Sequence, residues 1–464
     1  MVTQKAEPPT TVCHLVAVPY PGRGHVNPLM NICKQLLSRK PDILITFVVT
    51  EEWLGLIGSE PKPDNIRFRT LPNVIPSEHG RANDFPGFVK AVNTKLEAPF
   101  DVLLDRLEPP VSAVVADSYL VWMTRVGNRR NIPVASLWPM SASVFSVFSH
   151  FELLQQNGHF PLDLSERGDE VIDYIPGVSA TRVADLPTVY DGDGRKTLSI
   201  AVECASRVSN AQYFLSTSVY ELEPQVFDAL KAKFPFPVYP IGPSIPHFLM
   251  ESSSHTNNSG GPEYLKWLDS QPKGSVLYIS LGSFLSVSSA QLDEIVTGVK
   301  NSGVRYLWVA RGDASKIVKE YDGCGDHGFV VPWCDQLRVL SHGSIGGFLT
   351  HCGWNSTMEA IFSGVPMLTF PIFWDQIPNS KRIVDDWKIG CRVKKKYLGS
   401  DESLVTRDEI SELVKRFMDQ ENNIDGKAMR KRVKELQEAC RKAIAKGGSS
   451  DTNLDAFITN ISKG

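Results

Sequence analysis

The sequence predicts an α/β protein with two parallel-sheet lobes. Short apolar runs alternate with amphipathic helical periods in both halves of the chain, and each half opens with a strand that runs into a small-residue loop. Between the halves, residues 241–262 are rich in Ser, Asn and Gly, and the second part of this stretch has no hydrophobic period. We therefore expect an N-terminal lobe over residues 1–240, an interdomain linker over 241–262 and a C-terminal lobe over 263–450. A last helix within 451–464 is expected to pack back on the first lobe.

The first lobe begins with a strand, a loop and a helix. Residues 12–19 form an apolar run, the loop that follows holds Gly22 and Gly24, and apolar residues then recur at helical spacing after Asn27, the expected N-cap. Residues 44–49 supply the next strand, so the unit is βαβ and the sheet is parallel. Further strands are expected over 66–70, 113–116, 134–137, 213–216 and 238–239, with mostly helix over 85–107.

Two polar residues stand where strands of this lobe end. His25 lies in the loop after the first strand, and Asp117 directly follows the strand 113–116. A loop histidine is often a bystander, and an aspartate at a strand end is commonly only a helix cap. However, ligands of open α/β sheets bind at the carboxyl ends of the strands, and these ends share one edge. We therefore expect His25 and Asp117 to converge.

The second lobe repeats the pattern. A helix over 263–268 and a strand over 276–279 lead to a small-residue loop, in which Ser283 can offer its hydroxyl and N–H to a phosphate or simply form a turn. A helix over 290–300, a strand over 305–309 and a strand over 344–349 follow. The next helix, over 356–362, is expected to be capped by Asn355 or Ser356. A strand, a small-residue turn and a helix N-terminus together predict an anion site.

The stretch 333–376 carries most of the candidate binding residues. Trp333 offers a flat face for a base, and Glu359 can accept hydrogen bonds from two ribose hydroxyls. Asp375 and Gln376 form a polar pair suited to adjacent sugar hydroxyls. The side chains able to donate to a diphosphate are those of His351, Asn355 and Ser356. Alternatively, the tryptophans of this stretch are core aromatics and Asp375 is a turn cap.

The order of Trp333-Cys334-Asp335-Gln336, His351 to Ser356, Glu359, Gly364-Val365-Pro366 and Asp375-Gln376 resembles the donor-binding box of plant family 1 UDP-glycosyltransferases. The resemblance extends to motifs near residues 25, 117 and 283. It implies the GT-B architecture, two Rossmann-like parallel-sheet lobes facing each other across a cleft, with the donor on the second lobe and the acceptor on the first. The donor-binding residues that it implies are Ser283, Trp333, Cys334, Gln336, His351, Gly353, Trp354, Asn355, Ser356, Glu359, Asp375 and Gln376.

The resemblance also implies a reaction. His25 is the general base, Asp117 holds its ring, and glucose passes from UDP-glucose to a hydroxyl or carboxyl of a small lipophilic plant metabolite with inversion and without a metal. Trp354 and Gln376 match the members that use glucose. Many members carry Thr where this chain has Pro139, which cannot donate a hydrogen bond, and Ser141 is the candidate substitute. Asp335 replaces a usual proline.

The acceptor pocket is expected to be apolar with few fixed polar groups. The candidates, several of which would serve equally as core residues, are Phe85, Phe88, Trp138, Met140, Phe145, Phe148 and Phe373.

Composition and short motifs exclude other classes. A net charge of −3 argues against nucleic acid, and no apolar run reaches the ~18 residues of a membrane span. Eight cysteines without a C-x-x-C pair indicate a reduced, cytoplasmic protein. We expect it to be a monomer that uses UDP-glucose as co-substrate and needs no cofactor. Asp191-Gly192-Asp193 is interpreted as a turn, not a metal site. The alternatives are a non-catalytic UDP-sugar-binding protein and a nicotinamide-dependent oxidoreductase, whose third glycine Asn27 replaces.

Overall fold

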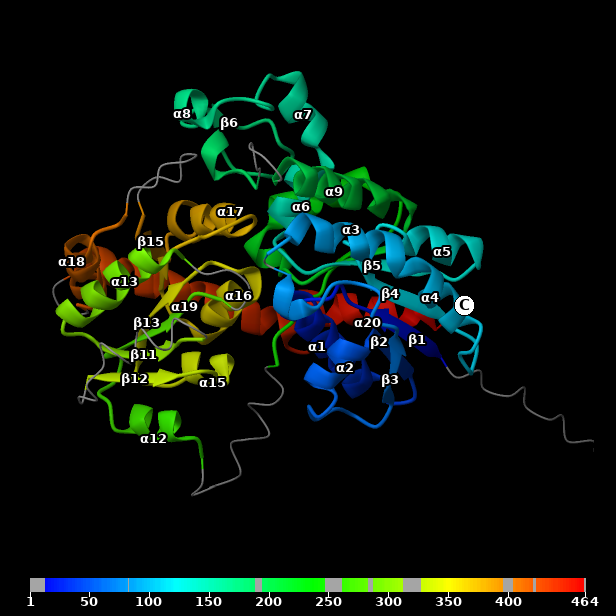
Figure 1. Ribbon diagram of the computed structural model, residues 1–464, viewed down its shortest axis with the longest axis horizontal. Coiled ribbons are helices and arrows are strands. Elements are labelled where there is room, and N and C mark those ends of the chain that lie inside the picture. Colours follow the sequence, from blue (N-terminus) through cyan, green and yellow to red (C-terminus); the bar gives the residue numbers. More distant parts are fainter. Residues whose placement is uncertain are drawn as a thin grey trace, which may run out of the picture.

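The computed structural model describes residues 13–81, 83–187, 194–246, 261–282, 287–311, 327–394, 404–419 and 423–462. Their strands form a seven-stranded sheet in the order β3-β2-β1-β4-β5-β8-β9 and a six-stranded sheet in the order β12-β11-β10-β13-β14-β15. Neighbouring strands in both sheets are parallel. Helices flank each sheet, and the two α/β lobes lie side by side (Figure 1). The predicted α/β fold with two parallel-sheet lobes is thus confirmed.

The first lobe contains the earlier part of the chain. Its large sheet is formed by β1 (His14–Val18), β2 (Leu44–Thr50), β3 (Ile66–Leu71), β4 (Ala113–Asp117), β5 (Val134–Trp138), β8 (Tyr213–Ser216) and β9 (Val238–Pro240). A small antiparallel ribbon pairs β6 (Val171–Ile172) with β7 (Thr181–Arg182). The helices are α1 (Arg23–Arg39), α2 (Glu51–Ile57), α3 (Phe85–Lys95), α4 (Glu97–Leu104), α5 (Met123–Arg129), α6 (Ala142–Ser149), α7 (Phe151–Gln156), α8 (Leu164–Arg167), α9 (Gly194–Arg207) and α10 (Pro224–Lys233).

The second lobe has the same layered build. Its strands are β10 (Val276–Ser280), β11 (Arg305–Val309), β12 (Gly328–Val331), β13 (Ile345–Thr350), β14 (Met367–Thr369) and β15 (Gly390–Arg392). Its helices are α12 (Glu263–Asp269), α13 (Ser289–Asn301), α15 (Gln336–Leu340), α16 (Trp354–Ser363), α17 (Gln376–Lys381), α18 (Arg407–Met418) and α19 (Ile424–Ile444), with a π-helical turn over Arg382–Asp386. The last helix, α20 (Ser449–Ile461), follows.

Two helices that carry site residues begin earlier than the sequence predicted. Helix α1 begins at Arg23 and not after Asn27, because the Gly22 carbonyl already accepts the N–H groups of His25 and Val26, each at 2.9 Å. Helix α16 begins at Trp354, with Gly353 as its N-cap, in place of Asn355 or Ser356. A small residue at the cap lets the turn form without a side-chain cap. As a result, His25 and Asn355 both lie in a first helical turn.

The end of the chain returns to the first lobe. Helix α20 lies against α1 and β9, next to the start of the chain in Figure 1. Asn453 donates to the Pro240 carbonyl at 2.8 Å, and Asn460 donates to the Tyr239 hydroxyl at 2.7 Å. Arg39 pairs with Asp451. None of the described helices is long and apolar enough to cross a membrane.

Candidate active site

His25 and Asp117 meet at the carboxyl edge of the first sheet. Asp117 ends β4, which pairs with β1, and His25 lies one short loop after β1. The His25 Nδ1 lies 2.7 Å from Asp117 Oδ2, although the two residues are 92 positions apart. Asp117 is 1% exposed and His25 is 23% exposed, so the carboxylate is buried while the ring reaches solvent. The second carboxylate oxygen of Asp117 accepts the Tyr119 N–H at 2.9 Å. The expected convergence of the two side chains is therefore observed.

Aromatic rings enclose the imidazole. The ring centroids of Tyr20 and Tyr119 lie 5.1 and 5.7 Å from that of His25. Tyr119 stacks on Trp138 at 5.5 Å, and its hydroxyl accepts a hydrogen bond at 3.3 Å from Trp374, which comes from the second lobe. The sequence did not single out Tyr20, Tyr119 or Trp374. Their only signal was their position beside Gly22, Asp117 and Asp375 in the chain.

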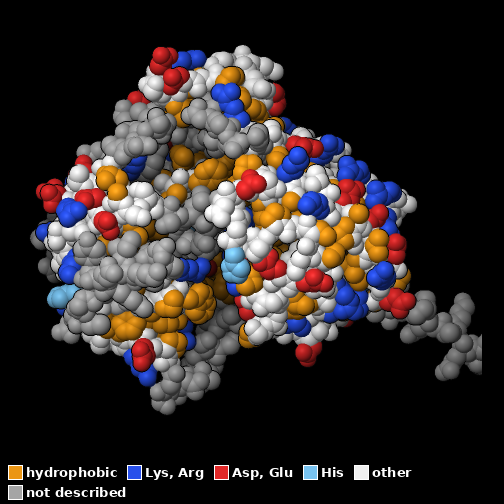
Figure 2. All heavy atoms as spheres, in the orientation of Figure 1, with side chains coloured by type: hydrophobic (Ala, Val, Ile, Leu, Met, Phe, Trp, Pro, Cys, Tyr) orange, Lys and Arg blue, Asp and Glu red, His pale blue; other side chains and the backbone are white. Residues whose placement is uncertain are grey.

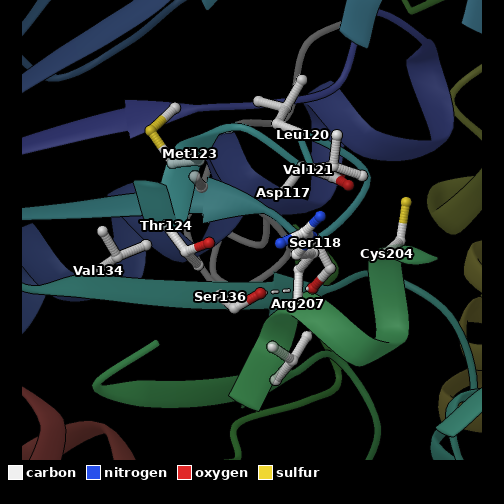
Figure 3. A pocket seen from close by; sticks show the side chains of 12 residues that line it. Asp117, Ser118, Leu120, Val121, Met123, Thr124, Val134, Ser136, Cys204 and Arg207 are labelled. Atoms are coloured by element: carbon white, nitrogen blue, oxygen red, sulfur yellow. Dashed lines mark hydrogen bonds between the residues drawn. The ribbon is translucent and has the colours of Figure 1, made fainter. Parts of the chain in front are cut away.

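A small hollow lies beneath Asp117 between the ends of β4 and β5 and helix α9 (Figure 3). Its hydroxyls belong to Ser118 and Ser136, whose oxygens lie 2.8 Å apart, and to Thr124. The buried Cys204 lines it too, and burial raises the pKa of that thiol, with the charge of Asp117 adding to the effect. Its volume is about 10 Å³, roughly the room that one water molecule needs and far below the ~300–1,000 Å³ typical of small-molecule sites. The hollow is therefore too small to hold a substrate.

The two lobes touch beside His25. Asn355, in the first turn of α16, donates its side-chain amide to the Gly24 carbonyl at 3.0 Å. This carbonyl is available because residue 28, four positions on in α1, is Pro28 and has no N–H to bond it. The missing N–H of Pro28 within α1 thus leaves an acceptor that the opposite lobe uses.

The predicted anion site of the second lobe contains His351. Strand β13 ends at Thr350, and the next residues turn sharply, with Cys352 at a φ of +67°. Burial lowers the pKa of His351 to about 4, opposed by a hydrogen bond to the backbone of Ser280, so the ring is neutral near pH 7. A Cβ on Gly353 would come within 2.5 Å of His351 Nε2, so only glycine fits there. The Nδ1 of His351 has no hydrogen-bond partner among the described residues. The neutral ring and the N–H groups of the α16 turn together suit a diphosphate.

Glu359 lies on α16, and a hydrogen bond from Gln336 fixes its side chain. Gln336 donates to Glu359 Oε2 at 2.5 Å and to Ser356 Oγ at 2.9 Å. The Tyr278 hydroxyl in turn donates to Gln336 Oε1 at 3.1 Å. Burial raises the pKa of Glu359 to about 7, opposed by the bond from Gln336. A half-buried carboxylate with one short bond retains acceptor capacity for ribose hydroxyls.

Asp375 and Gln376 lie at the start of α17. Burial raises the pKa of Asp375 to about 6, opposed by the hydrogen bond from Asn379 at 3.0 Å and by the charge of His25. Gln376 Oε1 accepts the N–H groups of Ile372 and Phe373 at 2.8 and 3.1 Å. The carbonyl side of Gln376 is thereby fixed, and its NH₂ group is left to donate.

The remaining donor-box residues differ in exposure. Trp333 is 64% exposed, as a stacking face requires, while Trp354 is 3% exposed and its Nε1–H has no partner among the described residues. Cys334 is buried, and burial raises the pKa of its thiol to about 11. Asp335 caps α15 by accepting the Arg338 N–H at 3.1 Å. Ser283, Asp191 and Asp193 lie outside the described residues.

Comparisons with known proteins identify relatives of this chain. A family model described as "UDP-glucoronosyl and UDP-glucosyl transferase" matches residues 194–421. The chain is 54% identical to UDP-glycosyltransferase 87A2 of Arabidopsis thaliana over 98% of each chain. It is also 54% identical to UDP-glycosyltransferase 87A1 of the same plant, over 96% of this chain and 100% of that one.

This chain belongs to the plant family 1 UDP-glycosyltransferases. Among solved structures, a Medicago truncatula family member, UGT71G1, complexed with UDP-glucose superposes with a TM-score of 0.81 at 27% identity, covering 98% of this chain and 99% of that chain. A UDP-glucosyltransferase from Polygonum tinctorium capable of glucosylating indoxyl gives 0.82 at 28% identity, covering 99% and 100%. The protein is therefore a glycosyltransferase enzyme with the GT-B fold of this family.

The predicted acceptor residues of this UDP-glycosyltransferase fall into two groups. Phe85 and Phe373 face each other across the lobes with ring centroids 6.2 Å apart, and both are partly exposed. Met140 is 8% exposed. The other group is fully buried in the first-lobe core and consists of Phe88, Trp138, Phe145 and Phe148, with the Phe88 ring 6.2 Å from that of Tyr20. The role of all seven residues in acceptor binding stays a prediction.

In the loop that contains Pro139, the hydroxyl of Ser141, the candidate substitute for the missing contact to the donor, already takes part in a hydrogen bond within the protein. Ser141 is 1% exposed, and its hydroxyl caps α6 by accepting the Val144 N–H at 3.3 Å. The N–H groups at the start of α6 are taken by the buried carboxylate of Glu223, which accepts from Ala142 and Ser143, each at 2.9 Å. In this UDP-glycosyltransferase the backbone N–H groups at the start of α6 therefore already have acceptors within the protein.

Proposed function

We propose that this enzyme transfers glucose from UDP-glucose to a hydroxyl or carboxyl of a small lipophilic acceptor, with inversion at the sugar carbon and without a metal. The observation that carries the proposal is the 2.7 Å contact between His25 Nδ1 and Asp117 at the edge of the cleft. A histidine bonded in this way is oriented and poised to take a proton from a bound acceptor.

The proposed reaction is a single displacement. Asp117 accepts the Nδ1–H, so the lone pair of Nε2 is free, and Nε2 takes the proton of the acceptor hydroxyl. The acceptor oxygen forms a bond to C1 of glucose while the bond from C1 to the diphosphate oxygen breaks, and UDP leaves from the opposite face. Buried Asp117 stabilises the imidazolium that results.

The departing diphosphate needs charge stabilisation. We propose that it comes from the N-terminus of α16 with Asn355 and Ser356, from neutral His351, and from Ser283. The uracil is proposed to stack on the exposed Trp333 with its edge near Cys334, and the ribose to bond Glu359. Glucose is the proposed sugar because Gln376 and Trp354 match the glucose-using members, and Asp375 and Gln376 face the sugar hydroxyls.

We propose that each lobe binds one of the two substrates. Residues 1–240 hold the acceptor, residues 263–450 hold the donor, residues 241–262 join them, and the segment 451–464 ties the second lobe to the first. A cytoplasmic, monomeric enzyme stays a prediction from the sequence. On the face in Figure 2, charged side chains of both signs are interspersed.

The test is turnover with a panel of acceptors. Purified protein is incubated with UDP-glucose and phenols, terpenols, flavonoids and carboxylic acids, while UDP release and glucosylated products are followed by mass spectrometry. We expect UDP to form only with an acceptor present, and ¹H NMR of the product to show a β-linked sugar. Turnover unchanged by excess EDTA is expected. Loss of turnover with EDTA would refute metal independence, and an α-linked product would refute inversion.

A further inference from the structure

A buried ion pair lies beside His25. Glu78 begins the short 3₁₀ turn η1 (Glu78–Gly80) between β3 and α3, and Arg81 follows that turn. Arg81 Nη1 lies 3.2 Å from Glu78 Oε2, and the two side chains are 10% and 19% exposed. Burying two charged groups costs several kcal/mol per ion before their attraction is counted. A pair kept in this position therefore calls for an explanation.

The guanidinium packs against the loop that leads into α1. Arg81 Nη1 donates to the Pro21 carbonyl at 3.0 Å. A Cβ on Gly22 would lie 2.5 Å from Arg81 Nη1 and 3.6 Å from His25 Cδ2, so the guanidinium and the imidazole edge flank the same point. The Gly22 carbonyl in turn accepts the His25 N–H at 2.9 Å. The placement of Arg81 thus fixes Gly22 and, through it, the start of the helix that carries the base.

The pair also acts on His25 through its charges. Burial raises the pKa of Glu78, while the charges of Arg81 and then of His25 lower it, so the carboxylate and the imidazole are within electrostatic reach. A carboxylate at this position favours the imidazolium, and a guanidinium disfavours it. At separations of several Å in a partly buried site, one unit charge changes proton binding by about 0.5–1 pH unit.

The other groups around His25 do not replace this pair. Asp117 on β4 bonds the imidazole directly, and Asp375 faces it from the second lobe. Burial raises the pKa of the phenols of Tyr20 and Tyr119, so both stay neutral. Further charged or titratable side chains nearby are Arg23 with its partner Glu60 at 2.9 Å, Glu52 bonded to the Glu78 N–H at 3.1 Å, and His79, whose charge also lowers the pKa of Glu78. Arg81 is the cation of this group that packs directly against the Gly22 side of the ring.

We propose that Arg81 and Glu78 are positioning residues for His25: together they fix the Pro21-Gly22 loop, and their opposite charges offset each other beside the imidazole. The proposal rests on the proposed role of His25 as the general base. Neither residue touches the reacting atoms. Their effect is on where the base stands and on the balance of charge around it.

The test is the pH dependence of kcat/KM in a double-mutant cycle. In Glu78→Gln, the guanidinium opposes the imidazolium without its partner, so the acidic limb should move to lower pH by about 0.5–1 unit. In Arg81→Gln, the limb should move the other way. The double variant should return close to the parent profile with a lower kcat, because the loop has lost its anchor. Arg81→Lys keeps the charge and loses the planar fork, so kcat should fall with little movement of the limb.

Controls separate the possible failures. The exposed pair of Arg125 with Glu97 on α5 and α4 gives matched variants, Arg125→Gln and Glu97→Gln, that should leave the profile unchanged. Far-UV circular dichroism and thermal denaturation report folding of each variant, and UDP binding by calorimetry reports whether the proposed donor site on the other lobe is intact. Limbs that stay in place, or that move in the same direction in both single variants, would overturn the proposal if His25→Ala is inactive. An active His25→Ala enzyme would instead overturn the proposed base, and this inference with it.

Discussion

Asn355 and Gly24, which are 331 positions apart, join the two lobes through a hydrogen bond of 3.0 Å. Gly24 precedes His25, and Asn355 stands in the first turn of the donor helix, so the contact links the proposed base to the proposed phosphate site. The acceptor carbonyl exists because Pro28 interrupts the hydrogen bonds of α1. The spacing of base and donor is therefore set by a main-chain group of one lobe and a side chain of the other.

Removing this contact should slow the reaction without unfolding the protein. Asn355→Ala loses a hydrogen bond with a net value of about 0.5–1.5 kcal/mol, so we expect kcat/KM to fall at least 2- to 10-fold. Asn453→Ala is the matched control, since Asn453 also donates an amide to a carbonyl at 2.8 Å but lies on α20 away from the cleft. Equal losses in both variants would show that the contact between Asn355 and Gly24 has no special role.

His25→Ala should lower kcat by about 10²–10⁴-fold while UDP binding and thermal stability stay close to those of the parent, because a general base contributes a factor of this size. Steady-state kinetics and UDP calorimetry provide the measurements. The chain offers a matched control in His342, which is 22% exposed and lies 3.1 Å from Asp269 Oδ1. His342→Ala should retain activity, and comparable losses in the two variants would contradict the assignment.

Gly353→Ala should weaken UDP binding by at least about 10-fold. The added methyl group would come within 2.5 Å of His351 Nε2, so either the ring or the turn before α16 must move. Overpacking of this kind typically costs about 1–3 kcal/mol. Gly343→Ala is the control, because no atom lies within 4 Å of the position that its Cβ would take. UDP affinity that is unchanged in Gly353→Ala would argue against His351 as a phosphate contact.

Gln376→Glu should separate sugar binding from nucleotide binding. Glutamate can still accept the N–H groups of Ile372 and Phe373, but it loses the NH₂ donor and places a charge beside Asp375. We expect affinity for UDP-glucose to fall about 10-fold and affinity for UDP to stay nearly constant, a difference of about 1.4 kcal/mol. In the control Gln212→Glu, the side chain likewise accepts a backbone N–H at 2.8 Å, from Val134, and both affinities should be unchanged.

Glu359→Gln should raise stability while it weakens UDP binding. The folded state holds the Glu359 proton up to about pH 7, against 4.5 for the ordinary group, so deprotonation costs stability as pH rises through this window. Above it, the neutral amide should be more stable than the carboxylate by about 3 kcal/mol, and the gain should vanish near pH 4. Thermal denaturation at pH 4.5 and 8 measures this effect. A gain of equal size at both pH values would mean that charge burial is not its cause.

Much of the fold could be predicted from the sequence. The strands from β1 to β5, with β8 to β11 and β13, lie within two residues of their predicted ends, because each is a short apolar run bounded by polar or small residues. Strands β6, β7, β12, β14 and β15 were missed; each has only two to four residues, too few to show a clear period. The starts of α1 and α16 were placed too late, because Gly22 and Gly353 cap these helices without a side-chain signal.

The candidate site was predictable where its residues share one local motif. His351, Gly353, Asn355 and Glu359 lie on a single strand-turn-helix unit, so their spacing along the chain already describes their arrangement in space. Arg81 and Tyr20 gave no comparable signal. Their place beside His25 depends on how separate loops fold over the edge of the sheet.

The sequence by itself determined the alternation of strands and helices, the two lobes and the order of the donor-site residues, because backbone hydrogen bonding and hydrophobic periodicity are local properties. Only the tertiary structure decided that Gly24 meets Asn355, that Trp374 bonds Tyr119 and that a buried ion pair stands next to the base. These contacts join residues that are far apart in the chain, or they depend on the direction in which a side chain points. They exist because two close-packed surfaces must satisfy each other's polar groups, a condition that no short stretch of sequence expresses.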